Sequence, residues 1–268
     1  MNIKGRFLLP LLILSLLLPA ILLGGCQSGG SGKLASIQSA KKLVVYTNAE
    51  FPPFEYISSD AVVGVDMDIA KAIADDLGVE LEINDAPFDG IITSLASGRG
   101  DIAISGFTIR EDRKEMVDFS KPYINSVQYL ILPADSDIKT MEDLGGKRVG
   151  AALGYTGEFV LDDEIEEGAL TGAGVQKITV NSAIDGALDI LNDRLDAVVM
   201  DEFVALKIAA DYDSLKAVKL VFEDGGDVAE EYGVAVPKGN QALVDRINKV
   251  IDTLNSDGKI AEWVIEHS

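Results

Sequence analysis

One short pattern occurs twice in this chain and limits the folds that the chain can adopt. The first copy is Leu95-Ala-Ser-Gly-Arg-Gly-Asp-Ile-Ala-Ile-Ser105, and the second is Leu191-Asn-Asp-Arg-Leu-Asp-Ala-Val-Val-Met200. Each reads as a helix end, a turn that contains Arg, an Asp, and a short apolar strand. Two such halves predict two lobes whose strand ends face each other across a cleft.

Strands and helices alternate along the chain, which is typical of βαβ units around a mostly parallel sheet. Two further strands, 129–133 and 232–237, are expected to cross between the lobes, and two crossovers make a hinge about which lobes can close on a ligand. The predicted fold class is therefore α/β, with two βαβ lobes joined by a two-strand hinge.

The beginning of the chain is typical of a secretory signal. Lys4 and Arg6 precede an apolar run from Phe7 to Leu23, and Cys26 follows two glycines. An uncleaved membrane helix is the alternative, since the run approaches the length of a membrane span. Leu23-Gly-Gly-Cys26 resembles the bacterial lipobox, which implies a lipid on Cys26.

These features divide the chain into four parts. We expect a signal peptide over residues 1–25, and the lipidated Cys with a flexible tether over residues 26–40. The first lobe is expected to comprise residues 41–128 and 231–268, and the second lobe residues 129–230.

Composition excludes several classes of function. The net charge is −21, and without Lys4 and Arg6 it is −23, which leaves no basic patch for nucleic acid and favours a monomer through self-repulsion. Cys26 and His267 are the only residues of their kinds, so ordinary zinc sites and Cys–His or Ser-His-Asp machinery are not expected. No phosphate-binding glycine motif is complete, and no cofactor or metal is predicted.

The stretch Ser105 to Arg113 is the main candidate for ligand binding. A buried strand that ends at Ser105 and Gly106 brings backbone N–H groups, the Thr108 hydroxyl and the Arg113 guanidinium together, and these groups suit a small carboxylate. The alternative is that Arg113 belongs to a solvated charge run over 110–115. A glycine-rich turn over 153–157 at a helix start also suits a carboxylate.

Several motifs together resemble the family-3 extracellular solute-binding proteins, the polar amino-acid receptors of ABC importers. They are Thr47 to Tyr56, Gly64 to Ile69, Phe88 to Ile92, Thr108 to Arg113, Val117 to Tyr123 and Tyr232 to Gly239. The resemblance runs in order from Lys41 onward. It implies the type II periplasmic-binding-protein fold, an extracytoplasmic location with a lipid anchor as the only membrane attachment, and permease subunits as partners.

The resemblance also implies a role for each site residue. Arg113 would clamp the ligand α-carboxylate, with Thr108 and the Thr156 backbone N–H assisting. Asp201 would receive the α-ammonium, helped by the Gly106 carbonyl and the Thr108 hydroxyl. Phe51 and Phe88 would sandwich the ligand side chain.

Two positions bear on the ligand side chain. Asn48 stands where receptors for lysine-type ligands often carry an Asp, and Tyr155 is larger than the usual residue and is expected to fill part of the side-chain pocket. These departures favour an uncharged polar side chain of modest size.

Two other functions remain open at this point. The fold also resembles periplasmic cyclohexadienyl dehydratases, in which a cleft carboxylate such as Glu158 or Asp201 would act as general acid. A sensor subunit that works with a separate partner chain is the other alternative. We favour a binding protein without enzymatic activity.

Overall fold

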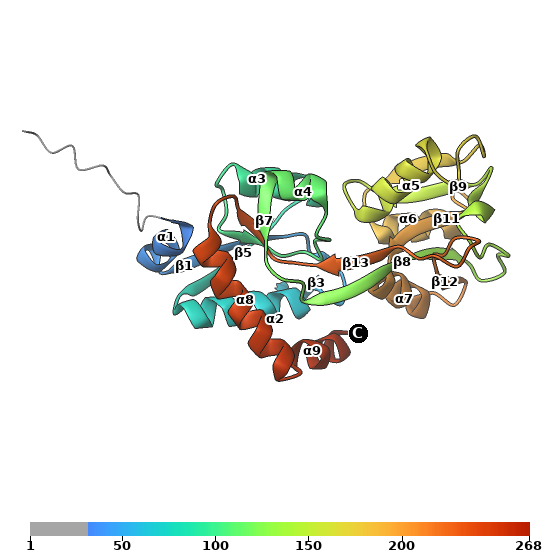
Figure 1. Cartoon of the computed structure of the whole chain (residues 1–268). Coiled ribbons are helices and arrows are strands. Elements are labelled where there is room, and N and C mark those ends of the chain that lie inside the picture. The colour runs from blue at the N-terminus through green and yellow to red at the C-terminus, as the bar shows by residue number, and fades with distance from the viewer. Residues whose placement is uncertain (1–31) are drawn as a thin grey trace, which may run out of the picture. The chain divides into compact units, whose positions relative to one another are not determined.

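Two mixed sheets organise the computed structural model, which describes residues 32–268 (Figure 1). The predicted signal over residues 1–25 and the lipidation site Cys26 lie outside the described residues. From residue 32 to the C-terminus, no helix is long and apolar enough to cross a membrane.

The first sheet has the strand order β5-β1-β6-β14-β7. Its strands are β1 (Lys42–Thr47), β5 (Glu80–Asp85), β6 (Ile102–Ala103), β7 (Val117–Phe119) and β14 (Ala235–Pro237). β1 runs parallel to β5 and β6, whereas β14 runs antiparallel to β6 and β7. Its helices are α2 (Val65–Leu77), α3 (Phe88–Ala96), α4 (Glu111–Met116), α8 (Gln241–Ser256) and α9 (Lys259–His267). A small sheet of β2 (Glu50–Phe51), β3 (Glu55–Ser58) and β4 (Ala61–Val63) adjoins α2.

The second sheet repeats this arrangement, with the order β10-β9-β11-β8-β12. Its strands are β8 (Ile124–Pro133), β9 (Arg148–Ala152), β10 (Gln176–Val180), β11 (Ala197–Asp201) and β12 (Leu215–Lys219). β9 runs parallel to β10 and β11, and β8 runs antiparallel to β11 and β12. Its helices are α5 (Thr156–Glu166), α6 (Ala183–Leu191), α7 (Glu202–Asp211) and the 3₁₀ turn η1 (Glu142–Leu144). Each lobe thus has a parallel core of three strands and then one antiparallel strand, β14 or β8. The edge strand beyond it, β7 or β12, runs in the same direction as the core.

The repeated Asp of the two sequence patterns has one structural role. The carboxylate of Asp101 accepts a hydrogen bond from the backbone N of Val44 in β1, at 2.8 Å. The carboxylate of Asp196 accepts one from the backbone N of Arg148 in β9, also at 2.8 Å. In both lobes the Asp therefore fixes the turn to the first residues of the neighbouring parallel strand, which explains why the pattern recurs.

Two paired strands connect the lobes. β13 (Ala229–Tyr232) runs antiparallel to β8, with Ala229 opposite Val127 and Tyr232 opposite Ile124. The crossing pair therefore lies at 124–127 and 229–232, slightly before the segments that the sequence predicts. The predicted lobe limits, 128/129 and 230/231, fall inside these two strands.

The predicted tether over residues 26–40 is wrong in its second half. Residues 33–40 form α1 (Lys33–Ala40), and Ile37 in this helix is buried. The backbone N of Lys33 donates to Asn240 Oδ1 at 2.9 Å, and the Lys33 ammonium pairs with Asp101 at 3.1 Å. Burial of Ile37 and these two contacts fix the helix to the first lobe, so the folded domain begins before Lys41.

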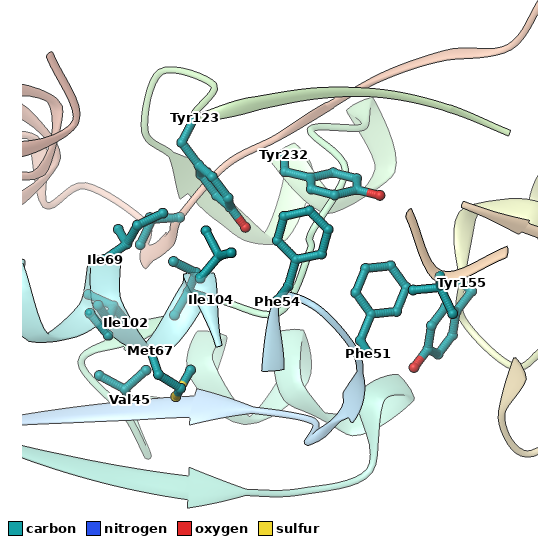
Figure 2. Close-up of a cluster of buried hydrophobic side chains, with 14 of the residues drawn as sticks. Val45, Phe51, Phe54, Met67, Ile69, Ile102, Ile104, Tyr123, Tyr155 and Tyr232 are labelled. Carbon is teal, nitrogen blue, oxygen red and sulfur yellow. The ribbon is translucent and has the colours of Figure 1, made fainter. Parts of the chain in front are cut away.

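Aromatic side chains join the core of the first lobe to the surface that faces the second. Phe54 and Tyr232 are fully buried, and their ring centroids are 5.3 Å apart. Phe51 lies next to them and leads towards Tyr155 from the second lobe (Figure 2). The hydrophobic core of the first lobe is therefore continuous with the place where the two predicted halves of the site meet.

Candidate functional site

The loop between β6 and α4 carries the first group of predicted site residues. Gly106 has a left-handed backbone, with φ +53°, and its N–H donates to Asp66 Oδ2 at 2.8 Å. A Cβ at this position would lie 2.6 Å from Cε1 of Phe51, so only glycine lets the Phe51 ring pack on the loop. The chain turns here and carries Thr108 and Arg113 away from the strand end.

Arg113 is a buried cation, with 5% of its surface exposed. Its guanidinium donates to the Thr108 carbonyl at 2.9 Å and to the Gly154 carbonyl at 3.0 Å. Burial, together with the charge of Arg110, lowers the pKa of Arg113 to about 10, so it stays protonated at neutral pH. The structure therefore places a charged donor fork between the lobes, and the reading of Arg113 as part of a solvated charge run is wrong.

Asp201 is the corresponding anion in the second lobe, at the end of β11 and 3% exposed. Oδ1 accepts from Gln128 Nε2 and Oδ2 accepts from the Tyr232 hydroxyl, both at 2.6 Å. Burial raises the pKa of Asp201, while these hydrogen bonds and the charge of Arg113 oppose the increase. No Lys or Arg within residues 32–268 forms a salt bridge with Asp201.

Three consecutive residues of the second lobe make hydrogen bonds to the first lobe. The carbonyl of Gly154 accepts from Arg113, and the Tyr155 hydroxyl donates to Asn48 Oδ1 at 3.0 Å. The Thr156 hydroxyl donates to the Thr108 hydroxyl at 2.8 Å. Thr156 also opens α5, where backbone N–H groups have no acceptor within the helix. These contacts bring Asn48, Thr108, Tyr155 and Thr156 to one place.

Tyr155 lies between the two predicted sandwich aromatics. Its ring centroid is 4.2 Å from that of Phe88. It is 5.8 Å from that of Phe51, and Figure 2 shows the Phe51 and Tyr155 side chains next to each other. Phe88 also stacks on Phe107 at 4.8 Å. Tyr155 therefore contacts both of the aromatic residues that the sequence predicts to sandwich the ligand side chain.

Beneath the site, two fully buried carboxyl groups hold the loop that carries Gly106. Ser105 Oγ donates to Glu55 Oε1 at 2.7 Å and accepts from the Asn48 backbone N at 3.0 Å. Asp66 Oδ2 accepts from Gly106 and from the Tyr123 hydroxyl. Burial raises the pKa of Glu55 well above its usual range and that of Asp66 to about 6. These hydrogen bonds position the backbone of the predicted ligand loop.

The sequence did not indicate two polar residues of the hinge strands that join this site. Gln128 of β8 and Glu230 of β13 are 0% and 3% exposed, and Gln128 Nε2 donates to both Asp201 and Glu230. The Thr108 hydroxyl donates to Glu230 Oε1 at 2.9 Å. The available signal was a lone Gln in the apolar run from Val127 to Pro133, because such a residue needs a buried partner.

A cavity of about 380 Å³ adjoins the site. Asn48 and Phe88 line it from the first lobe, and Leu153 and Asn181 line it from the second. The other residues that line it include three carboxylates and no basic side chain. These residues are Glu50, Asp85, Ala86, Pro87 and Asp89. The charge of these walls suits a cationic group better than an anionic one.

Comparisons with known proteins agree with this arrangement. The sequence profile of the bacterial extracellular solute-binding proteins, family 3, matches residues 43–266. The arginine-binding extracellular protein ArtP of Bacillus subtilis is 32% identical over 248 residues, which cover 92% of this chain and 94% of that protein. The L-cystine-binding protein TcyJ of Escherichia coli is 31% identical, covering 85% and 83% of the two chains.

A solved structure shows the same likeness in three dimensions. The substrate-binding protein AbpA of Streptococcus pneumoniae, bound to L-arginine, is 31% identical to this chain with a TM-score of 0.79. The match covers 86% of this chain and 96% of that one. The predicted type II periplasmic-binding-protein fold is thereby confirmed.

Proposed function

This chain belongs to the bacterial extracellular solute-binding proteins of family 3, and we propose that it captures a free polar L-amino acid between two closing lobes and delivers it to an ABC importer. The relatives described above are named as binding proteins, and the absence of catalysis is part of this proposal.

The observation that carries the proposal is a pair of opposite buried charges on different lobes. Arg113 comes from the first lobe and Asp201 from the second, and each acts on the charge of the other. A free amino acid has a carboxylate and an ammonium on one carbon, so it can pair with both residues only when the lobes are closed. Since it binds the closed form better, it shifts the protein towards that form.

For the side chain, we propose a cationic group, with L-arginine as the first candidate. The walls of the adjoining cavity carry Glu50, Asp85 and Asp89. Of the relatives described above, ArtP is named as arginine-binding and AbpA was solved with L-arginine bound. This replaces the expectation of an uncharged side chain of modest size, which rested on Asn48 in place of an Asp and on the large Tyr155. Carboxylates from neighbouring positions can supply the negative charge that Asn48 lacks.

The location and the partners follow from the same proposal. We propose that the chain acts outside the cytoplasm as a monomer, anchored through a lipid on Cys26, and that permease subunits recognise its closed form. The dehydratase alternative would need a carboxyl that is free to donate a proton. Glu158 instead accepts from the Gly154 backbone N at 2.7 Å and pairs with Lys177 at 3.3 Å, and both oxygens of Asp201 accept hydrogen bonds, which disfavours that role for either residue.

A thermal-shift screen of the twenty amino acids tests the proposal. A ligand at about 1,000 times its Kd stabilises the folded state by about 4 kcal/mol, which raises the melting temperature by several degrees. L-arginine is expected to give the largest increase. No shift with any of the twenty would contradict the proposal, and turnover of arogenate or prephenate would establish the dehydratase instead.

A further inference from the structure

Glu230 lies in the hinge and shares a donor with Asp201. Its Oε2 accepts from Gln128 Nε2 at 2.7 Å, and the same nitrogen donates to Asp201 Oδ1 at 2.6 Å. Because an amide nitrogen has two hydrogens, one side chain of β8 satisfies both carboxyl groups at once. The two acidic groups are therefore neighbours, although one comes from β11 and the other from β13.

The remaining contacts of Glu230 lead across the two lobes. Its Oε1 accepts from the Thr108 hydroxyl at 2.9 Å, and Thr108 accepts from the Thr156 hydroxyl at 2.8 Å. This chain of hydrogen bonds begins in the second lobe, passes through the first, and ends on a hinge strand. Glu230 is thus connected to three of the residues proposed to bind the amino acid.

Few cationic side chains lie near Glu230 and Asp201. The titratable groups that face Glu230 are Asp201 from β11, Tyr232 from its own strand and Arg113 from α4. Arg113 is the only cation among them, and its described hydrogen bonds go to two carbonyl oxygens. Burial and the charge of Asp201 raise the pKa of Glu230 to about 8. Two like charges at such a site cannot both persist easily, so one group holds a proton.

We propose that Glu230 is a second carboxyl group of the ammonium site, which carries a proton while the site is free and loses it to solvent when an α-ammonium binds. This inference rests on the proposed function, because it needs the ammonium to lie at Asp201. A cation beside a carboxyl group favours its ionised form, so the incoming ammonium displaces the proton from Glu230. Amino-acid binding is then linked to pH through a hinge residue.

Calorimetric titration with L-arginine, followed by the other nineteen amino acids if it gives no heat, provides the test. The titration is made at pH 7 in phosphate and in Tris, whose ionisation enthalpies differ. With a pKa of about 8, roughly nine tenths of Glu230 is protonated at this pH, so release of about 0.5 to 1 proton per amino acid is expected. The association constant is expected to rise by up to about tenfold per pH unit between pH 6 and 8.

Two variants test whether the released proton comes from Glu230. Glu230→Gln is expected to bind with an enthalpy that no longer depends on the buffer, and Glu230→Ala provides a second variant if the amide does not fold. Glu231→Gln is the matched control, because Glu231 is exposed on the same strand and should keep the wild-type proton release.

The possible results separate the two proposals. No heat with any amino acid contradicts the proposed function. If the wild type binds normally with an enthalpy that does not depend on the buffer, no proton is released and the inference about Glu230 is wrong, while the proposed function stands. If both Glu230 variants release as many protons as the wild type, the proton does not come from Glu230.

Discussion

Replacing Gly106 by alanine tests the packing that supports the ligand loop. The substitution forces a non-glycine residue into the left-handed region at φ +53°, which costs about 1–2 kcal/mol. The new Cβ would also lie 2.6 Å from the Phe51 ring, which is 3% exposed and has little room to move. Overpacking of this kind costs a further 1–3 kcal/mol.

Gly78 provides the matched control. It ends α2 with φ +67°, and a Cβ at that position would meet nothing within 4 Å. Gly78→Ala should therefore lose only the backbone contribution, about 1–2 kcal/mol, whereas Gly106→Ala should lose about 2–5 kcal/mol. The difference between the two variants isolates the contact with Phe51.

Urea unfolding of both variants measures this difference, and calorimetry with L-arginine measures its effect on binding. Displacement of Phe51 should weaken binding by at least about tenfold in Gly106→Ala, which corresponds to 1.4 kcal/mol. Gly78→Ala should bind normally. Equal losses of stability in the two variants, or unchanged affinity in Gly106→Ala, would refute the role assigned to this contact.

Three further predictions concern charge and location. Arg113→Ala should weaken amino-acid binding by about 2–5 kcal/mol in calorimetry, because the ligand carboxylate would be buried unpaired, whereas Arg110→Ala should not. The free energy of unfolding should fall as pH rises from 5 to 9, since folding raises the pKa of Asp66 to about 6 and of Glu230 to about 8. Urea titrations of Glu230→Gln should show a smaller decrease in the free energy of unfolding at the upper end of this pH range. An increase in the free energy of unfolding with pH would contradict the prediction. Cys26→Ser should move the protein from the membrane fraction to the soluble fraction, and continued membrane association would argue against lipidation.

The sequence predicts those parts of the site that lie next to a clear local signal. Gly106, Thr108 and Arg113 follow an apolar strand, and Asp201 ends its counterpart, so their positions follow from the rule that ligands gather at the carboxyl ends of parallel strands.

The hinge residues have no comparable signal. Ala229-Glu-Glu-Tyr232 contains two successive glutamates, and only one of them can face inward on a strand. The register with β8 decides which one, since Glu230 lies opposite Ser126 and is buried while Glu231 is exposed. Such a register depends on a partner about a hundred residues away, and a local pattern cannot supply it.

The start of the fold was missed for a different reason. α1 follows a glycine-rich stretch and has only eight residues, so it resembles a continuation of the tether. Its stability comes from Ile37 and from contacts with Asn240 and Asp101, which are distant in sequence.

The paired strands β8 and β13 also bear on how such a protein can be engineered. They carry Gln128, Glu230 and Tyr232, and all three side chains contact the carboxyl groups described above. The hinge strands are therefore only one or two hydrogen bonds away from the carboxyl group that is proposed to bind the ligand. Binding can affect the hinge directly, without a chain of intervening residues. A reporter inserted into this ribbon would disturb recognition and motion together, so an optical sensor built on this scaffold should carry its fluorophores on helices remote from the crossover.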